Sequence, residues 1–123
     1  MRQQAGWHVL GLSLMWLVTT IPIGFAQDVS QLRGEAFIAG KTPVDPPPDE
    51  PKNSHAYMTV SGTSALRMYR AMRAKEEANL CEAGKRMKRA GALMCSVSRD
   101  GRSATCDFSV DLINGVLDGG RAC

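Results

Sequence analysis

The four cysteines are the residues of this sequence whose chemistry is easiest to state. No two of Cys81, Cys95, Cys106 and Cys123 form a Cys-x-x-Cys pair, the spacing that zinc knuckles and thioredoxin-type redox sites use. We therefore expect no metal and no cofactor at these thiols. An even number of cysteines in a small exported chain favours disulfides, with buried free thiols as the alternative.

Candidate catalytic groups are few. His55 adjoins a proline-rich segment, and we expect its side chain to be exposed to solvent and to have no catalytic role. Asp107 and Asp111 share one face of a predicted strand, where four residues separate them by about 13 Å, more than the roughly 5–9.5 Å between glycosidase carboxylates. We assign no catalytic residue. The alternative, a small cell-envelope hydrolase without a recognisable motif, would draw its titrating groups from His55, Tyr57, Tyr69, Asp107 and Asp111.

Basic residues are concentrated in the middle of the chain. Ten basic and four acidic residues lie between positions 62 and 102, although the whole chain has a net charge of only +3. A surface of this kind could bind an acidic protein or an anionic envelope polymer. The alternative is an ordinary solvated face that Glu76, Glu77 and Glu82 partly neutralise. The candidate contact residues are Arg67, Arg70, Arg73, Lys85, Arg86, Lys88 and Arg89.

The stretch 93–112 predicts a β-hairpin that positions two of the cysteines. Residues 104–112 alternate between apolar and polar side chains, which is typical of a half-buried strand. A two-residue turn at Asp100-Gly101 would place Cys95 opposite Cys106 in a hydrogen-bonded position, with Cα atoms about 5.5 Å apart and within disulfide range. A longer turn would move this register. A bridge between these two residues leaves Cys81 to pair with Cys123.

The remaining pattern predicts one helix and further short strands. Leu66, Tyr69 and Met72 recur at helical spacing within residues 64–74. The apolar stripe then fails, so the helix kinks or a second short helix continues to Gly84. Residues 55–60 and 116–117 resemble strands, and residues 85–89 a basic loop. The expected fold is α+β: one amphipathic helix packed on a small antiparallel sheet of three to four strands, stapled by disulfides.

The beginning of the chain predicts export. A basic start, an apolar run over residues 9–23 and small residues ending at Ala26 are typical of a cleaved secretory signal peptide (1–26), with an uncleaved membrane anchor as the alternative. Residues 27–54 are expected to be a flexible segment that ends in a proline-rich linker (42–54), with a short strand or helix around the apolar residues 36–38 as the alternative. That linker is a spacer or, alternatively, a ligand for an aromatic groove. Residues 55–123 would then form the domain, in the periplasm or secreted.

These features together favour a non-catalytic binding or inhibitor-type module. Its expected partner is a protein or an anionic envelope polymer, contacted through the basic surface. A nucleic-acid partner is not expected, because no aromatic residues alternate with the cations and the protein is exported. No membrane span is expected after signal cleavage. A purely structural secreted protein is the remaining alternative.

Overall fold

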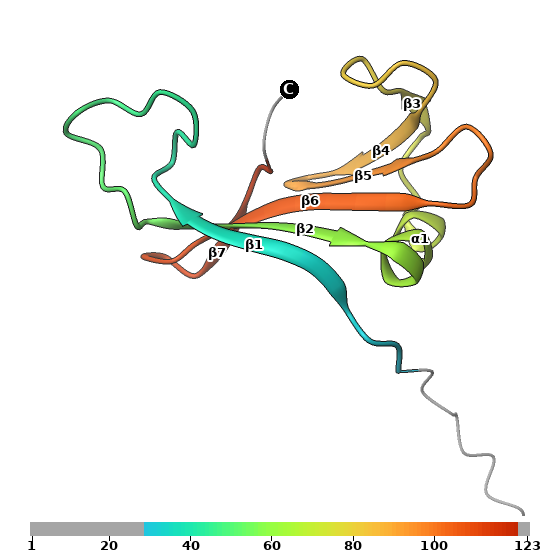
Figure 1. The fold of residues 1–123 in the computed structure, drawn as a ribbon, viewed down its shortest axis with the longest axis horizontal. Helices are drawn as coiled ribbons and strands as arrows, with labels where there is room; N and C mark the ends of the chain where they lie inside the picture. The colour runs from blue at the N-terminus through green and yellow to red at the C-terminus, as the bar shows by residue number, and fades with distance from the viewer. Residues whose placement is uncertain (1–28, 121–123) are drawn as a thin grey trace, which may run out of the picture.

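Residues 29–120 are described by the computed structural model, and they form one antiparallel sheet of seven strands with a single helix (Figure 1). The elements are β1 (Arg33–Ala39), β2 (His55–Ser61), α1 (Gly62–Ala71), β3 (Glu77–Ala78), β4 (Arg86–Ala90), β5 (Leu93–Val97), β6 (Ala104–Asp111) and β7 (Val116–Asp118). The strand order is β1-β2-β6-β5-β4-β3, and β7 also pairs with β6. The expected α+β fold, a helix on three to four strands, is therefore wrong: the fold is predominantly β.

The helix is short. It has ten residues, and no helix in the described part of the chain is long and apolar enough to cross a membrane. The predicted signal peptide and its cleavage site after Ala26 lie outside the described residues.

Strand β6 is the centre of the sheet. Strand β2 pairs with one of its edges from Thr105 to Asp111. The other edge is shared, because β5 pairs with the first half of β6 and β7 with its last three residues. Strands β2, β5 and β7 are therefore all direct neighbours of β6, and their side chains lie beside those of β6 on both faces of the sheet.

The β5–β6 hairpin confirms the predicted pairing of Cys95 with Cys106, through a different turn. The two residues are register partners and form a disulfide. The turn is a four-residue loop, residues 99–102, closed by Ser98 N donating to Ser103 O at 2.9 Å, and Asp100 lacks the positive φ of a type I′ turn. Because the loop has four residues and not two, the pair formed by residues 99 and 102 no longer belongs to the ladder. The facing partners stay the same, but the hydrogen-bonded and non-hydrogen-bonded positions are exchanged. The cysteines therefore occupy a non-hydrogen-bonded position, with Cα atoms 4.0 Å apart.

Strand β4 replaces the predicted basic loop. Its side chains alternate in direction, but most of them are charged, so the hydropathy pattern carries no period of two. A two-residue turn at Gly91-Ala92 joins it to β5, since Ala90 pairs with Leu93. Gly91 has a φ of 57°, and glycine at the first position of a two-residue turn is the requirement of a type II′ hairpin. That dipeptide was the available signal for this strand.

Helix α1 ends earlier than predicted. Its last residue is Ala71, and Met72 has an extended backbone with a ψ of 125°. The Lys88 ammonium of β4 donates to the carbonyl oxygens of Tyr69 and Met72 at 3.2 and 2.9 Å. These bonds satisfy carbonyl groups that the end of a helix leaves unpaired. In place of the expected kinked continuation or second helix, the described chain forms β3 beside β4.

Strand β1 belongs to the same sheet as the other strands. It pairs with β2 along all seven residues, from Arg33 opposite Ser61 to Ala39 opposite His55. Residues 42–54, expected to be a linker ahead of the domain, instead lie in the loop of this hairpin, residues 40–54. The predicted boundary between residues 54 and 55 therefore falls inside a β-hairpin. Only a short apolar run, residues 36–39, marked β1 in the sequence, and it is too short to show a period.

The core lies between α1 and one end of the sheet, and the proline-rich loop projects from the other end (Figure 1). The buried apolar side chains of the core are Val60, Ala65, Tyr69, Cys95, Val97, Ala104 and Cys106. We call the sheet face that carries the cystine the helix-side face. Away from α1, this face carries Met58 and Phe108, which are only partly buried. The helix thus covers only part of its face.

Candidate functional site

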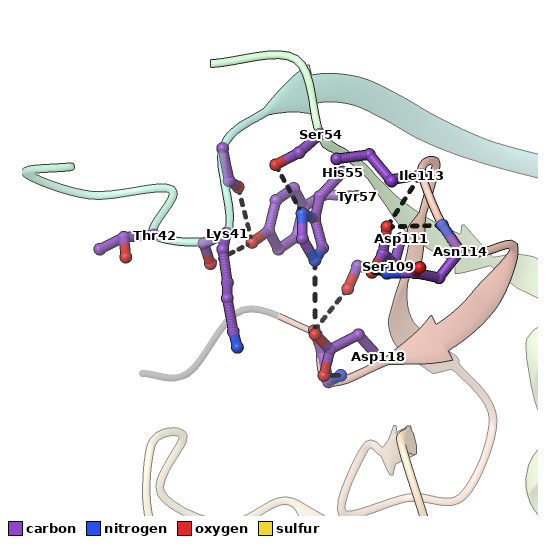
Figure 2. A network of polar contacts seen from close by, with 12 residues as sticks. Lys41, Thr42, Ser54, His55, Tyr57, Ser109, Asp111, Ile113, Asn114 and Asp118 are labelled. Carbon is purple, nitrogen blue, oxygen red and sulfur yellow. Dashed lines mark hydrogen bonds and ion pairs between the residues drawn. The ribbon is translucent and has the colours of Figure 1, made fainter. Parts of the chain in front are cut away.

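A cluster of polar side chains lies on the opposite face of the sheet, beside the proline-rich loop (Figure 2). The register of β2 and β6 places His55 opposite Asp111 and Tyr57 opposite Ser109. Alternate residues of a strand share a face, so these four side chains lie together, and Asp118 joins them from the end of β7. Three residues that the sequence nominated separately, His55, Tyr57 and Asp111, are thereby brought into one site.

His55 is buried, which corrects the expectation of an exposed side chain. It is 5% exposed, and its Nδ1 lies 2.9 Å from Ser54 Oγ. Its Nε2 faces Asp118 Oδ2 at 3.4 Å without an aligned hydrogen-bond partner among the described residues. The approach to Asp118 is therefore an ion pair only when the imidazole is protonated.

The proline-rich loop is fastened to this cluster. The Tyr57 hydroxyl lies 3.1 and 2.7 Å from the carbonyl oxygens of Gly40 and Lys41, to which it donates. Thr42 N donates to the Glu50 carboxylate at 2.6 Å, and this bond lowers the pKa of Glu50. The loop therefore packs against β2 instead of hanging free as a spacer.

Ser54, His55 and Asp118 are connected in the order of a Ser-His-Asp triad, but their setting does not suit nucleophilic catalysis. A catalytic serine must face its substrate, whereas Ser54 is 6% exposed and its hydroxyl also lies 3.4 Å from Pro51 O. We interpret the cluster as a structural network that joins the loop, β2 and β7.

Hydrogen bonds keep the two aspartates of the cluster in their charged form. The Asn114 side-chain amide is the largest cause of the lowered pKa of Asp111, and backbone N–H groups of the following turn add to it. The Gly119 N–H, which donates at 2.8 Å, is the main cause of the lowered pKa of Asp118. Burial raises the pKa of Tyr57. The cluster thus presents carboxylates and a neutral phenol around one imidazole.

The other two nominated titrating groups lie outside the cluster. Asp107 accepts a hydrogen bond from the Thr59 hydroxyl at 2.6 Å across the β2–β6 pair. Tyr69 lies on α1 and donates to the Glu76 carboxylate at 2.5 Å. Burial, followed by this hydrogen bond, raises the pKa of Tyr69 to about 12. Both groups are used in contacts within the fold.

The candidate basic residues of β4 do not form one patch. Alternation directs Arg86 and Lys88 to the helix-side face and Arg89 to the other. Arg86 donates to Glu76 at 2.9 Å, and Lys88 lies 4.8 Å above the Tyr69 ring. The preceding residue, Lys85, pairs with Glu82. These cations are engaged with the chain's own acids, carbonyls and ring.

The candidate basic residues of α1 have a different setting. Arg67, Arg70 and the following Arg73 are all exposed. Arg67 and Arg70 lie on α1, which contains no aspartate or glutamate, and Arg73 follows two residues after the helix ends. Of the predicted basic surface, this is the part that stays close together in the chain.

The described residues contain no group of three or more His, Cys, Asp or Glu side chains placed to hold a metal ion. Cys81 is disulfide-bonded. Its predicted partner, Cys123, lies outside the described residues, so the Cys81–Cys123 pairing stays a prediction.

Three members of the polar cluster, Ser54, Ser109 and Asp118, were not nominated from the sequence. A signal existed for Asp118, because the Asn114-Gly115 turn was recognised and its continuation pairs Asp118 with Ser109. Ser54 had no such signal, since it lies at the end of a loop whose return to the sheet depends on β1.

Comparison with known proteins gives no relative. No family model matches the chain, and no curated protein or solved structure matches it. A function therefore has to come from the geometry itself.

Proposed function

We propose that the protein is an exported, non-catalytic binding module that contacts an acidic macromolecule through the exposed side of α1. The observation that carries this proposal is the exposure of Arg67, Arg70 and Arg73 on, and just after, a helix that contains no acidic residue.

Three cations in and just before β4, Lys85, Arg86 and Lys88, are engaged in contacts within the fold. Lys88 binds the last carbonyls of α1, Arg86 binds Glu76, and Lys85 binds Glu82. The pairing of Glu76 and Glu82 with these cations reduces the negative charge that they present near α1. The proposed contact surface is therefore Arg67, Arg70 and Arg73, which are all exposed.

The exposed side of α1 suits an anionic partner. Arg67 and Arg70 are three residues apart on α1, which makes them neighbours on one ridge of the helix, and Arg73 follows two residues after its end. Arginine also binds carboxylates through two parallel hydrogen bonds, which gives specificity beyond charge alone. Like-signed charges on one ridge accelerate the approach of an oppositely charged partner and make binding sensitive to salt.

The disulfide supports a location outside the cytoplasm. Disulfides persist in oxidising compartments and are rare where thiols are kept reduced, and Cys95–Cys106 is buried at the centre of the core. Together with the signal-peptide pattern, this favours the periplasm or the extracellular medium.

Binding to polyglutamate, a defined acidic polymer, tests the proposal. The triple variant Arg67→Gln/Arg70→Gln/Arg73→Gln is compared with Lys52→Gln/Arg99→Gln/Arg102→Gln, which removes the same charge from two loops. We expect binding by the wild type that weakens as salt rises, a loss of about tenfold or more in the α1 variant, and a smaller loss in the loop variant. Circular dichroism confirms that both variants are folded.

Equal losses in the two triple variants would show that only net charge matters and would contradict the α1 surface. An absence of binding by the wild type at low salt would contradict an anionic partner.

A further inference from the structure

Strand β1 is the longest open edge of the described sheet. It pairs with β2 on one side, and no described strand pairs with the other side. Six of its seven residues are exposed. The strand at the other end of the order, β3, has only two residues. A long exposed edge is a template for another strand, and most proteins keep such edges short or covered.

The hydrogen-bond pattern identifies which backbone groups of β1 point outward. Leu112 N donates to Ser54 O at 2.8 Å, so even-numbered residues around β2 bond to β6 and odd-numbered ones to β1. The residues of β1 that bond to β2 are consequently the odd-numbered ones. The N–H and C=O groups of Gly34, Ala36 and Ile38 are left pointing away from the sheet.

A groove lies on the helix-side face just inside this edge. It has a volume of about 220 Å³ and is lined mostly by apolar groups, including Leu32, Gly34, Ala36, Met58 and Phe108. Drug-sized ligands use pockets of about 300–1,000 Å³, so this groove is better matched to a side chain. The small residues at positions 34 and 36 leave it open toward the edge.

Ile38 is the side chain of β1 that fits this groove in a second copy. It is 56% exposed on the same face. When two β1 strands pair antiparallel with Ala36 opposite Ala36, Ile38 of each chain lies opposite Gly34 of the other. All three outward-pointing residues then form hydrogen-bonded pairs. This register also keeps like charges apart, because Glu35 faces the uncharged Phe37. A register with Glu35 opposite Glu35 would bring two carboxylates together.

We propose that the outer edge of β1 is a homodimer interface, in which two copies form one continuous antiparallel sheet and each Ile38 enters the groove beside Gly34 of the other. The interface is isologous, with a two-fold axis at Ala36, so it closes at two copies. Every contact occurs twice, and any substitution counts twice.

Sedimentation equilibrium of the purified protein tests this interface. We expect a monomer–dimer equilibrium that is weakened by about tenfold or more in Ile38→Glu, which places a carboxylate in an apolar groove, and in Ala36→Pro, which removes only an outward N–H. The matched control is Ile113→Glu, at an isoleucine 73% exposed in the β6–β7 turn, and it should dimerise like the wild type.

Single cysteines test the register. Ala36→Cys should form an inter-chain disulfide on a non-reducing gel, because facing residues in hydrogen-bonded pairs lie about 5.5 Å apart. Glu35→Cys should form it much less, since Glu35 faces Phe37. A protein that is monomeric at every concentration would overturn the proposal and leave the edge to a different partner. Dimers that folded Ile38→Glu and Ala36→Pro leave unchanged would also overturn it.

Discussion

The role of Lys88 in the structure differs from the role that the sequence predicted for it. In the sequence it belongs to a run of cations that resembles a binding loop. In the structure its ammonium binds two carbonyls at the end of α1 and lies above the Tyr69 ring. Charged hydrogen bonds of this kind contribute about 1.5–3 kcal/mol each when the groups are shielded from water, and solvent reduces that value for a partly exposed side chain.

Replacing Lys88 should therefore destabilise the fold. We expect Lys88→Met to lower the free energy of unfolding by about 1–2 kcal/mol. Arg89→Met, one residue along and exposed, should lower it by less than about 0.5 kcal/mol. Urea unfolding followed by far-ultraviolet circular dichroism measures both. Equal effects of the two variants would show that Lys88 is only a surface cation.

Tyr69 gives a second residue-scale prediction, in its titration. The chain has two tyrosines, so Tyr57→Phe leaves only Tyr69, which should ionise near pH 12 instead of 10.0. A folded-state pKa above the unfolded one adds stability that is complete below pH 10 and is lost as the pH rises to 12. Ultraviolet absorbance of the tyrosinate measures the midpoint. Glu76→Gln should lower it, because the Tyr69–Glu76 contact adds to the raised pKa, and a midpoint at 10 in the parent would refute the contact.

At the scale of elements, the close packing of strand β1 against β2 is the feature that defines this side of the sheet. A Cβ at Gly34 would lie 2.1 Å from Thr59 O, a backbone atom of β2. Any larger residue must push the two strands apart, because a backbone carbonyl cannot rotate away. The close approach of β1 to β2 thus depends on this glycine.

Gly34→Ala should loosen β1 without unfolding the core. We expect a loss of about 1–3 kcal/mol in the stability of the fold and faster amide exchange at residues 33–39 than at β6. Gly119→Ala is the control, because a Cβ there meets nothing within 4 Å. Unchanged exchange along β1 in Gly34→Ala would show that the strands are not packed this closely.

Sequence patterns predicted the elements whose signals are local. The strict alternation of residues 104–112 and the hairpin dipeptides gave β6, β7 and the facing cysteines. Strands β1 and β4 were missed because their period is hidden, in one case by shortness of the apolar run and in the other by charge. The polar cluster depends on β1, because Tyr57 binds the loop between β1 and β2 beside the buried His55.

The buried cystine affects the molecule as a whole. Cys95 and Cys106 are 11 residues apart, and closing a loop of that size stabilises a fold by about 3 kcal/mol in the chain-entropy account. We expect Cys95→Ala/Cys106→Ala to lose about that much, or slightly more because both residues are fully buried. Urea unfolding under non-reducing conditions measures it. A loss below about 1 kcal/mol would show that the bridge contributes little to the domain.

The central claim is that β1 is an integral strand of one sheet, on which both the buried cluster and the proposed dimer interface depend. All four cysteines lie after residue 80, so disulfides within the chain cannot hold β1 to the remaining strands if the loop is cut. A protease recognition sequence inserted between Val44 and Asp45, both exposed, allows the loop to be cut at one place.

After cleavage at this site, the two fragments are separated by size-exclusion chromatography and identified by mass. An integral β1 predicts that they elute together under native conditions and separate only in denaturant, with earlier separation in Gly34→Ala. Release of the N-terminal fragment under native conditions as soon as the loop is cut would show that residues 27–54 are a flexible segment and linker, and would contradict the fold described for this edge.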